Sequence, residues 1–138
     1  MSGAQLAPLP DVLPPRVRAE FARLDRAGPL PPGLGAVSQG RAGSRAEGTE
    51  ICFLLRRADG RITAARFLAY GCPYTLAVCN WLAGWLEGGA AEAGRLGSPE
   101  RWARELGVPL ERLGRLLIVE DALRAALQGA AGHGISSS

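Results

Sequence analysis

Cys52, Cys72 and Cys79 are the residues of this chain whose side chains are best suited to metal or covalent chemistry. A thiolate binds iron or zinc and acts as a nucleophile, and three cysteines are an odd number for a disulfide framework. The first fifteen residues lack the basic start and apolar block of an export signal, so we expect a cytoplasmic protein with free thiols. The single histidine, His133, is expected to be exposed in a flexible tail rather than to bind a metal.

Composition and motifs argue against several classes of function. The 16 basic and 13 acidic residues are interspersed along the chain, which does not favour a nucleic-acid-binding surface. Apolar stretches are too short to cross a bilayer, so we expect no membrane association. No serine-histidine-aspartate set, phosphate-binding loop or dinucleotide-binding glycine pattern is present, and we therefore do not expect an enzyme.

The spacing of apolar residues predicts the elements that must position these cysteines. It predicts helices at 15–25, 73–87, 99–106 and 113–127, and strands at 36–38, 51–57 and 61–70. We expect residues 28–48, which are rich in glycine and proline, to be mostly loop. The predicted fold is α+β, with a small antiparallel three-stranded sheet packed on helices in two layers. A single domain at 15–128 would follow an irregular arm at 1–14 and precede a flexible tail at 129–138.

This arrangement separates the three thiols. Cys72 lies at the corner between the last strand and the next helix, because Pro73 suits the first turn of a helix. Cys79 is seven residues further along that helix, about 10 Å away along the axis. Cys52 is expected to be a small buried residue within a strand. Trp81, Trp85 and Trp102, in contrast, fall at the spacing of helical core residues.

Three segments carry a resemblance to a known family. Residues 60–73 (GRITAARFLAYGCP) resemble the central signature of iron-sulfur cluster assembly scaffolds of the NifU amino-terminal and IscU type. Residues 117–127 (LIVEDALRAAL) resemble the closing helix of that family, and residues 81–88 resemble the end of its central helix. The resemblance implies the α+β scaffold fold and a role in cluster assembly, with a cysteine desulfurase or other assembly proteins as partners.

The same resemblance implies a ligand set that this chain retains only in part. The family's first cysteine and its aspartate match Glu47 and Thr49, and its histidine-cysteine pair matches Gly114 and Arg115. Only Cys72 is kept. A [2Fe-2S] cluster takes about four protein ligands, so the expected cofactor is iron or a cluster held with altered ligands, or none. A homodimer contributing Cys72 from each subunit and a monomer both remain open.

The substitutions leave further alternatives open. Glu47 and Arg115 either form an ion pair that ties the loop to the last helix, or are both solvated. Arg115 and the helix start either favour a nucleophilic Cys72 thiolate that accepts sulfur, or Cys72 is a packing residue at a tight corner. Pro109 stands where the family has a chaperone-docking motif, or only separates two helices. The expected function is scaffold-like handling of iron or sulfur through Cys72; the alternative is a metal-free module that docks to assembly partners.

Overall fold

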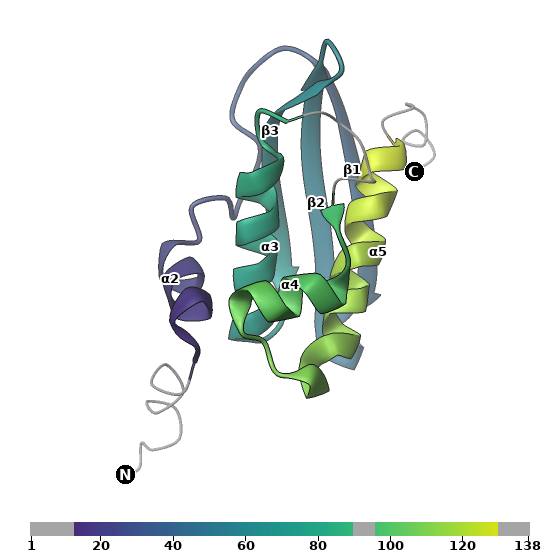
Figure 1. The fold of residues 1–138 in the computed structure, drawn as a ribbon. Coiled ribbons are helices and arrows are strands. Elements are labelled where there is room, and N and C mark those ends of the chain that lie inside the picture. The colour runs from purple at the N-terminus through teal and green to yellow at the C-terminus, as the bar shows by residue number, and fades with distance from the viewer. Residues whose placement is uncertain (1–12, 90–95, 130–138) are drawn as a thin grey trace.

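The computed structural model describes residues 13–89 and 96–129, so His133 and most of both predicted terminal segments lie outside the described residues. The predicted α+β fold is confirmed (Figure 1). The elements are, in chain order, α2 (Pro15–Arg23), β1 (Ala36–Ser44), the 3-10 turn η1 (Arg45–Glu47), β2 (Thr49–Ala58), β3 (Arg61–Tyr70), α3 (Pro73–Leu86), α4 (Pro99–Leu106), the 3-10 turn η3 (Leu110–Arg112) and α5 (Leu113–Gly129).

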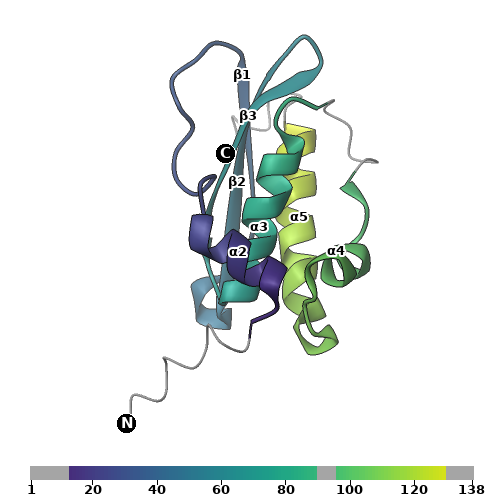
Figure 2. The same cartoon turned by 60° about the vertical axis from the view of Figure 1, so that its left-hand side comes forward.

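The sheet is antiparallel in the order β1-β2-β3, and its helices lie on one face (Figure 2). The predicted β2–β3 hairpin turns at Asp59 and Gly60, whose φ values of 52° and 75° are the left-handed angles that a tight hairpin needs. Ile51, Phe53 and Leu55 alternate along β2 and are all fully buried. The period-two pattern of β2 therefore directs this apolar row toward the helices.

Strand β1 is the element that departs most from prediction. We expected a strand only at 36–38, but β1 continues to Ser44 and pairs with β2 along its whole length. The reason is close packing, because a Cβ at Gly40 would lie 2.2 Å from the backbone nitrogen of Ala126 in α5. The glycines that suggest a loop instead let a strand pass directly beneath a helix.

The core lies between the sheet and the helical layer of α3 and α5. α3 covers β3, and α5 lies along β1 and β2 (Figure 1). Trp102 on α4 is 1% exposed and its indole Nε1 donates a hydrogen bond to the carbonyl of Leu96 at 2.6 Å. The prediction that all three tryptophans are core residues was wrong for Trp85, which is 41% exposed, whereas Trp81 is partly buried and packs against the core. Their side of α3 faces the space beside α4 rather than the sheet.

The segment after α2 is anchored to α3 by the buried side chain of Asn80. Its Oδ1 accepts from the backbone N–H of Arg26 at 2.8 Å. Its Nδ2 donates to Glu20 Oε1 at 2.8 Å and to Asp25 Oδ1 at 3.0 Å. One amide thus joins α2 and the following turn to the helical layer.

None of the helices in the described ranges has the length and apolar character needed to span a bilayer.

Candidate functional site

The ends of several elements meet at one end of the sheet, which we call the tip. The η1 turn joins β1 to β2 there, and the pairing of Glu50 with Tyr70 brings the end of β3 beside it. The start of α5 also reaches this end, because a Cβ at Gly43 would lie 2.9 Å from the side chain of Ile118. The tip therefore gathers η1, the β3–α3 corner and the first turns of α5.

Cys72 lies at the N-cap of α3, between the end of β3 and Pro73 at the first helical position. The predicted strand-to-helix corner is confirmed. The thiol is half-buried, and its Sγ lies 3.4 Å from the hydroxyl oxygen of Thr75, which is fully buried. When Cys72 is a thiolate, the Thr75 hydroxyl has to be the donor of this hydrogen bond.

Several opposing effects act on the pKa of Cys72. Burial on its own raises the pKa of the thiol, since the charged form loses solvation. Hydrogen bonds from the Thr75 hydroxyl and from the backbone N–H groups of Thr75 and Tyr74, together with the positive charge of Arg112, outweigh that effect. The resulting pKa of Cys72 is lower than that of an ordinary cysteine, which favours the nucleophilic thiolate.

The cation that assists Cys72 is Arg112, whereas the sequence pointed to Arg115. Arg112 belongs to η3, and its guanidinium carbon lies 5.3 Å from the centroid of the Tyr74 ring. On the other side of the corner, the guanidinium of Arg45 lies 4.9 Å from the Tyr70 ring. Two arginine–tyrosine contacts thus flank the Cys72 corner, each of the kind that orders a long cationic side chain.

The structure brings the other sequence-predicted positions to the same end of the fold but does not pair them. Glu47 ends the η1 turn, and Gly114 and Arg115 lie in the first turn of α5. Within the described ranges, no salt bridge joins Glu47 to Arg115, so of the two alternatives the ion pair is not formed. Thr49 is 1% exposed, and its hydroxyl is buried without a hydrogen-bond partner among the described residues.

The donor set at the tip does not fit an iron-sulfur cluster bound by one chain. Cys79 is fully buried, and burial raises the pKa of its thiol far above the ordinary range. Cys52 is 6% exposed, and its position in β2 pairs with Leu68, four residues before Cys72. No group of three or more histidine, cysteine, aspartate or glutamate residues in the described part of the chain is placed to hold a metal ion. Cys72 is thus left as a single thiolate, where a cluster needs about four ligands.

Sequence reasoning overlooked the residues that surround Cys72, namely Tyr70, Tyr74, Thr75 and Arg112. The spacing of Cys72 and Thr75 carried a usable signal, because the N-cap and the third residue of a helix lie close together. Arg112 had no comparable local signal. Its approach depends on how η3 folds back against the start of α3.

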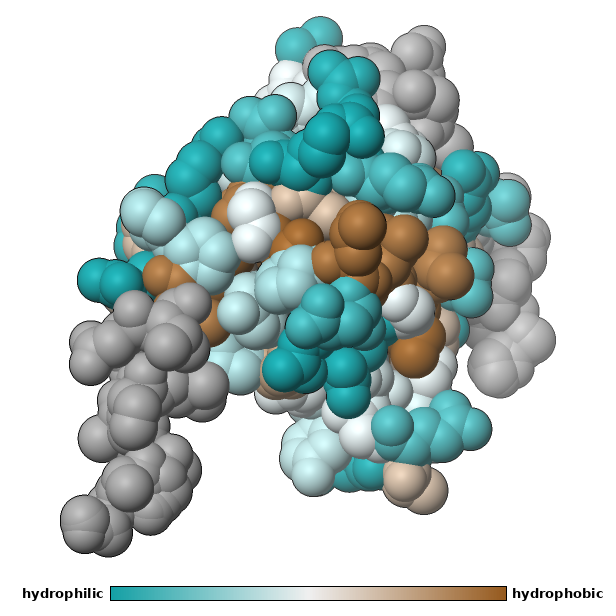
Figure 3. Space-filling model, turned by 60° about the horizontal axis from the view of Figure 1, so that its bottom comes forward, coloured by the Kyte–Doolittle hydropathy of each residue, from teal (hydrophilic) through white to brown (hydrophobic). Residues whose placement is uncertain are grey.

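The tip also carries exposed apolar side chains. Leu110 in η3 is 74% exposed and Leu117 in α5 is 47% exposed, while Gly114 between them presents no side chain. Figure 3, which shows the molecule from the end where α5 begins, shows hydrophobic surface gathered between hydrophilic groups. The tip therefore combines a reactive type of side chain with surface suited to contact another protein.

Comparison with known proteins supports the fold. No protein-family profile matches the sequence, and no curated protein matches it. The structure is similar to that of a nitrogen-fixing NifU-like protein (N-terminal) from Brucella abortus, with a TM-score of 0.63 and 15% identity over 84% of this chain and 92% of the other. It is also similar to a putative iron-sulfur cluster assembly scaffold protein for the SUF system from Fervidobacterium islandicum, with a TM-score of 0.58 and 14% identity over 81% of this chain and 93% of the other.

Proposed function

We propose that this protein acts in iron-sulfur cluster assembly as a scaffold-like protein that handles sulfur through Cys72, without holding a complete cluster in one chain. The fold shared with a NifU-like protein and a putative SUF-system scaffold supports the process. The single observation that carries the proposed chemistry is the Cys72 corner. A cysteine with a lowered pKa lies there, with its Sγ 3.4 Å from the Thr75 hydroxyl and with the charge of Arg112 acting on it.

The proposed step is transfer of sulfur from a cysteine persulfide on a donor protein such as a cysteine desulfurase. The Cys72 thiolate attacks the outer sulfur of the donor persulfide, and a new S–S bond forms on Cys72. The S–S bond of the donor breaks, and the donor cysteine leaves as a thiolate. The proton of the persulfide stays with the transferred sulfur, so the exchange needs no external oxidant or reductant.

A chemical donor tests this step directly. Protein incubated with glutathione persulfide should gain the mass of one sulfur atom, and that gain should be lost in Cys72→Ser but kept in the matched control Cys52→Ser. Equal sulfur uptake by wild type and Cys72→Ser would overturn the proposal. Because Cys52 and Cys79 are buried, they should not substitute for the missing thiol.

The exposed apolar residues of the tip favour a second candidate function, a metal-free module that docks to assembly partners. Leu110 and Leu117 border the tip and would lose exposed apolar area on binding. Both candidate functions predict that this protein alone does not hold a complete cluster, and anaerobic incubation with iron and sulfide tests that expectation. Visible charge-transfer absorption with stoichiometric iron would show that a cluster assembles after all, most simply between two copies that each supply Cys72.

A further inference from the structure

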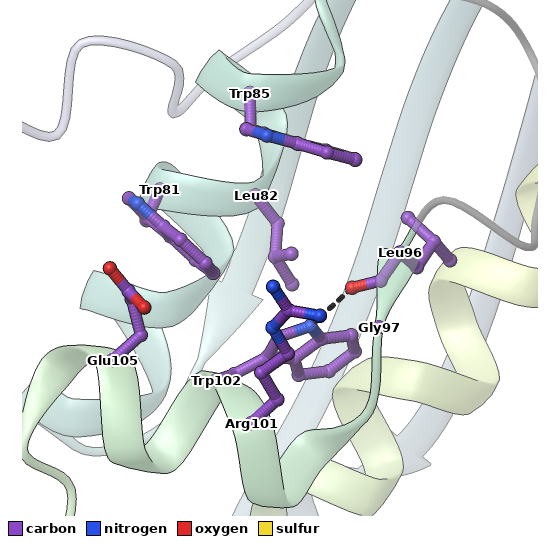
Figure 4. A pocket seen from close by; sticks show the side chains of 8 residues that line it. All are labelled: Trp81, Leu82, Trp85, Leu96, Gly97, Arg101, Trp102 and Glu105. Carbon is purple, nitrogen blue, oxygen red and sulfur yellow. Dashed lines mark hydrogen bonds between the residues drawn. The ribbon is translucent and has the colours of Figure 1, made fainter.

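All three tryptophans of the chain line one surface hollow, which we call the tryptophan pocket. It lies between α3 and α4 (Figure 4). Its volume is about 230 Å³. Trp81, Leu82 and Trp85 come from α3, Trp102 and Arg101 from α4, and Leu96 from the segment before α4. Trp81 is nine residues beyond Cys72 on α3, so the pocket lies about 14 Å along the helix from the thiol.

The walls of the pocket are held in place by the fold. Trp102 is buried and is tied to the carbonyl of Leu96, which fixes the floor of the pocket. Ser98 caps α4, with its side chain accepting from the backbone N–H of Arg101. Trp85 is 41% exposed at the rim of the pocket. The floor of the pocket and the start of α4 are thus held by hydrogen bonds within the fold.

The described lining of the pocket carries one cation, Arg101, and one anion, Glu105. Arg101 is exposed, and its guanidinium points from α4 into the space between the two α3 tryptophans and Leu96 (Figure 4). It forms no salt bridge within residues 13–89 and 96–129. The carboxylate of Glu105, at the edge of the pocket, is paired with Arg16 at 2.8 Å. Among the described lining residues, Arg101 is therefore the cation that is not paired with a carboxylate.

We propose that the tryptophan pocket is a docking site for an acidic segment of a partner protein, which inserts one apolar side chain between the tryptophans and places a carboxylate on Arg101. The size of the pocket favours a single anchoring side chain, because sites for whole small molecules usually have volumes of about 300–1,000 Å³. Tryptophan and arginine are also the residue types that contribute most at protein interfaces. The site does not involve Cys72, so it can recruit a partner whether or not the tip transfers sulfur.

The test uses short peptides, acetylated and amidated, with a single phenylalanine flanked by two aspartates. Matched peptides replace the aspartates by lysines, or the phenylalanine by alanine. We expect the aspartate–phenylalanine peptide to shift the indole N–H signals of Trp81 and Trp85 in two-dimensional NMR, with saturation. Each matched peptide should bind at least about tenfold more weakly, the factor expected for one lost charge-assisted hydrogen bond or one lost anchor.

Substitutions of two arginines on α4 supply the matched variants. Arg101→Glu and the gentler Arg101→Gln should weaken binding of the aspartate–phenylalanine peptide at least about tenfold and about threefold, respectively. Arg104→Glu makes the same charge change on the same helix outside the pocket, and should leave binding within about twofold. Both arginines are exposed, so thermal melts should confirm that the variants fold.

Three outcomes would overturn the proposal. They are the absence of indole shifts up to the solubility limit of the peptide, equal binding of the lysine and aspartate peptides, and an equal effect of Arg104→Glu and Arg101→Glu. Cys72→Ser should bind the peptide like wild type. Failure of sulfur transfer and failure of docking are thus distinguishable.

Discussion

The Sγ of Cys72 lies 3.4 Å from the Oγ1 of Thr75 across the first turn of α3. The Thr75 side chain is buried, and its hydroxyl can stabilise the thiolate by donating a hydrogen bond. Arg112 adds positive charge from a different segment of the chain. The corner thus combines a local effect of the helix start with a tertiary effect of η3.

The pH dependence of Cys72 alkylation should report this environment. Because the pKa of Cys72 is lowered in the folded protein, the thiolate forms at a lower pH than in the unfolded chain, and the midpoint of the alkylation rate should lie below the midpoint measured in urea. Thr75→Val or Arg112→Gln removes a lowering effect and should move the midpoint upward. Alkylation rates measured with iodoacetamide at a series of pH values give this midpoint for wild type and for each variant.

Arg115→Gln is the matched control for that experiment, because it removes a nearby arginine that does not act on the thiol. Its midpoint should equal that of wild type. A shift as large as that of Arg112→Gln would contradict the assignment of Arg112 as the assisting cation. In urea, all variants should return to the ordinary midpoint, since the helix start and η3 are then lost.

The contact of β1 with α5 predicts opposite effects for two glycine-to-alanine substitutions. A methyl group at Gly40 would collide with backbone atoms of Ala122 and Ala126, so Gly40→Ala should lower the free energy of unfolding by about 3 kcal/mol or more. A methyl group at Gly114 has no neighbour within 4 Å, and Gly114→Ala should raise it by up to about 1 kcal/mol. Urea denaturation followed by circular dichroism measures both, and a tolerated Gly40→Ala would contradict the observed packing.

Removal of the Asn80 amide should destabilise the protein and leave Asp25 without its hydrogen bond from this amide. Asn80→Ala removes hydrogen bonds to Glu20, Asp25 and the backbone of Arg26, and should cost about 2–3 kcal/mol of unfolding free energy. Gln128→Ala, an exposed amide on α5, is the control and should change it by less than about 0.5 kcal/mol.

The same substitution predicts a pH effect with a definite sign. The Asn80 hydrogen bond is the main reason that the pKa of Asp25 is lowered, so Asn80→Ala should raise it, as carboxyl chemical shifts can show. A lowered pKa in the folded state contributes stability above the unfolded pKa of about 3.9, and this contribution is lost as pH falls through the folded pKa. The stability difference between wild type and Asn80→Ala should therefore narrow on acidification.

Restoring the family ligands should convert the tip into a cluster site. The combined substitutions Glu47→Cys, Thr49→Asp, Gly114→His and Arg115→Cys introduce thiol, carboxyl and imidazole groups at the four positions matched to the family ligands. After anaerobic incubation with iron and sulfide, this variant should show visible charge-transfer absorption that wild type lacks. Addition of Cys72→Ser should abolish the absorption. A colourless restored variant that is still folded would mean that the matched positions do not converge.

The sequence by itself determined the features that depend on neighbouring residues. The alternation of Ile51, Phe53 and Leu55 predicted a buried strand face, and the order of Gly71, Cys72 and Pro73 predicted a strand-to-helix corner. Such patterns are local because strand and helix periods, and the demands of a helix start, act over only a few residues.

Tertiary structure decided the features that depend on which distant segments touch. It extended β1 through Gly40, because the backbone of α5 leaves no room there for a side chain. It gave the Cys72 thiolate its cation from Arg112, left Glu47 and Arg115 unpaired with each other, and opened the tryptophan pocket beside α4. The spacing of apolar residues shows which side of a helix is apolar but not which element covers that side. On α3, Trp81 and Trp85 lie at the edge of the surface that other elements cover.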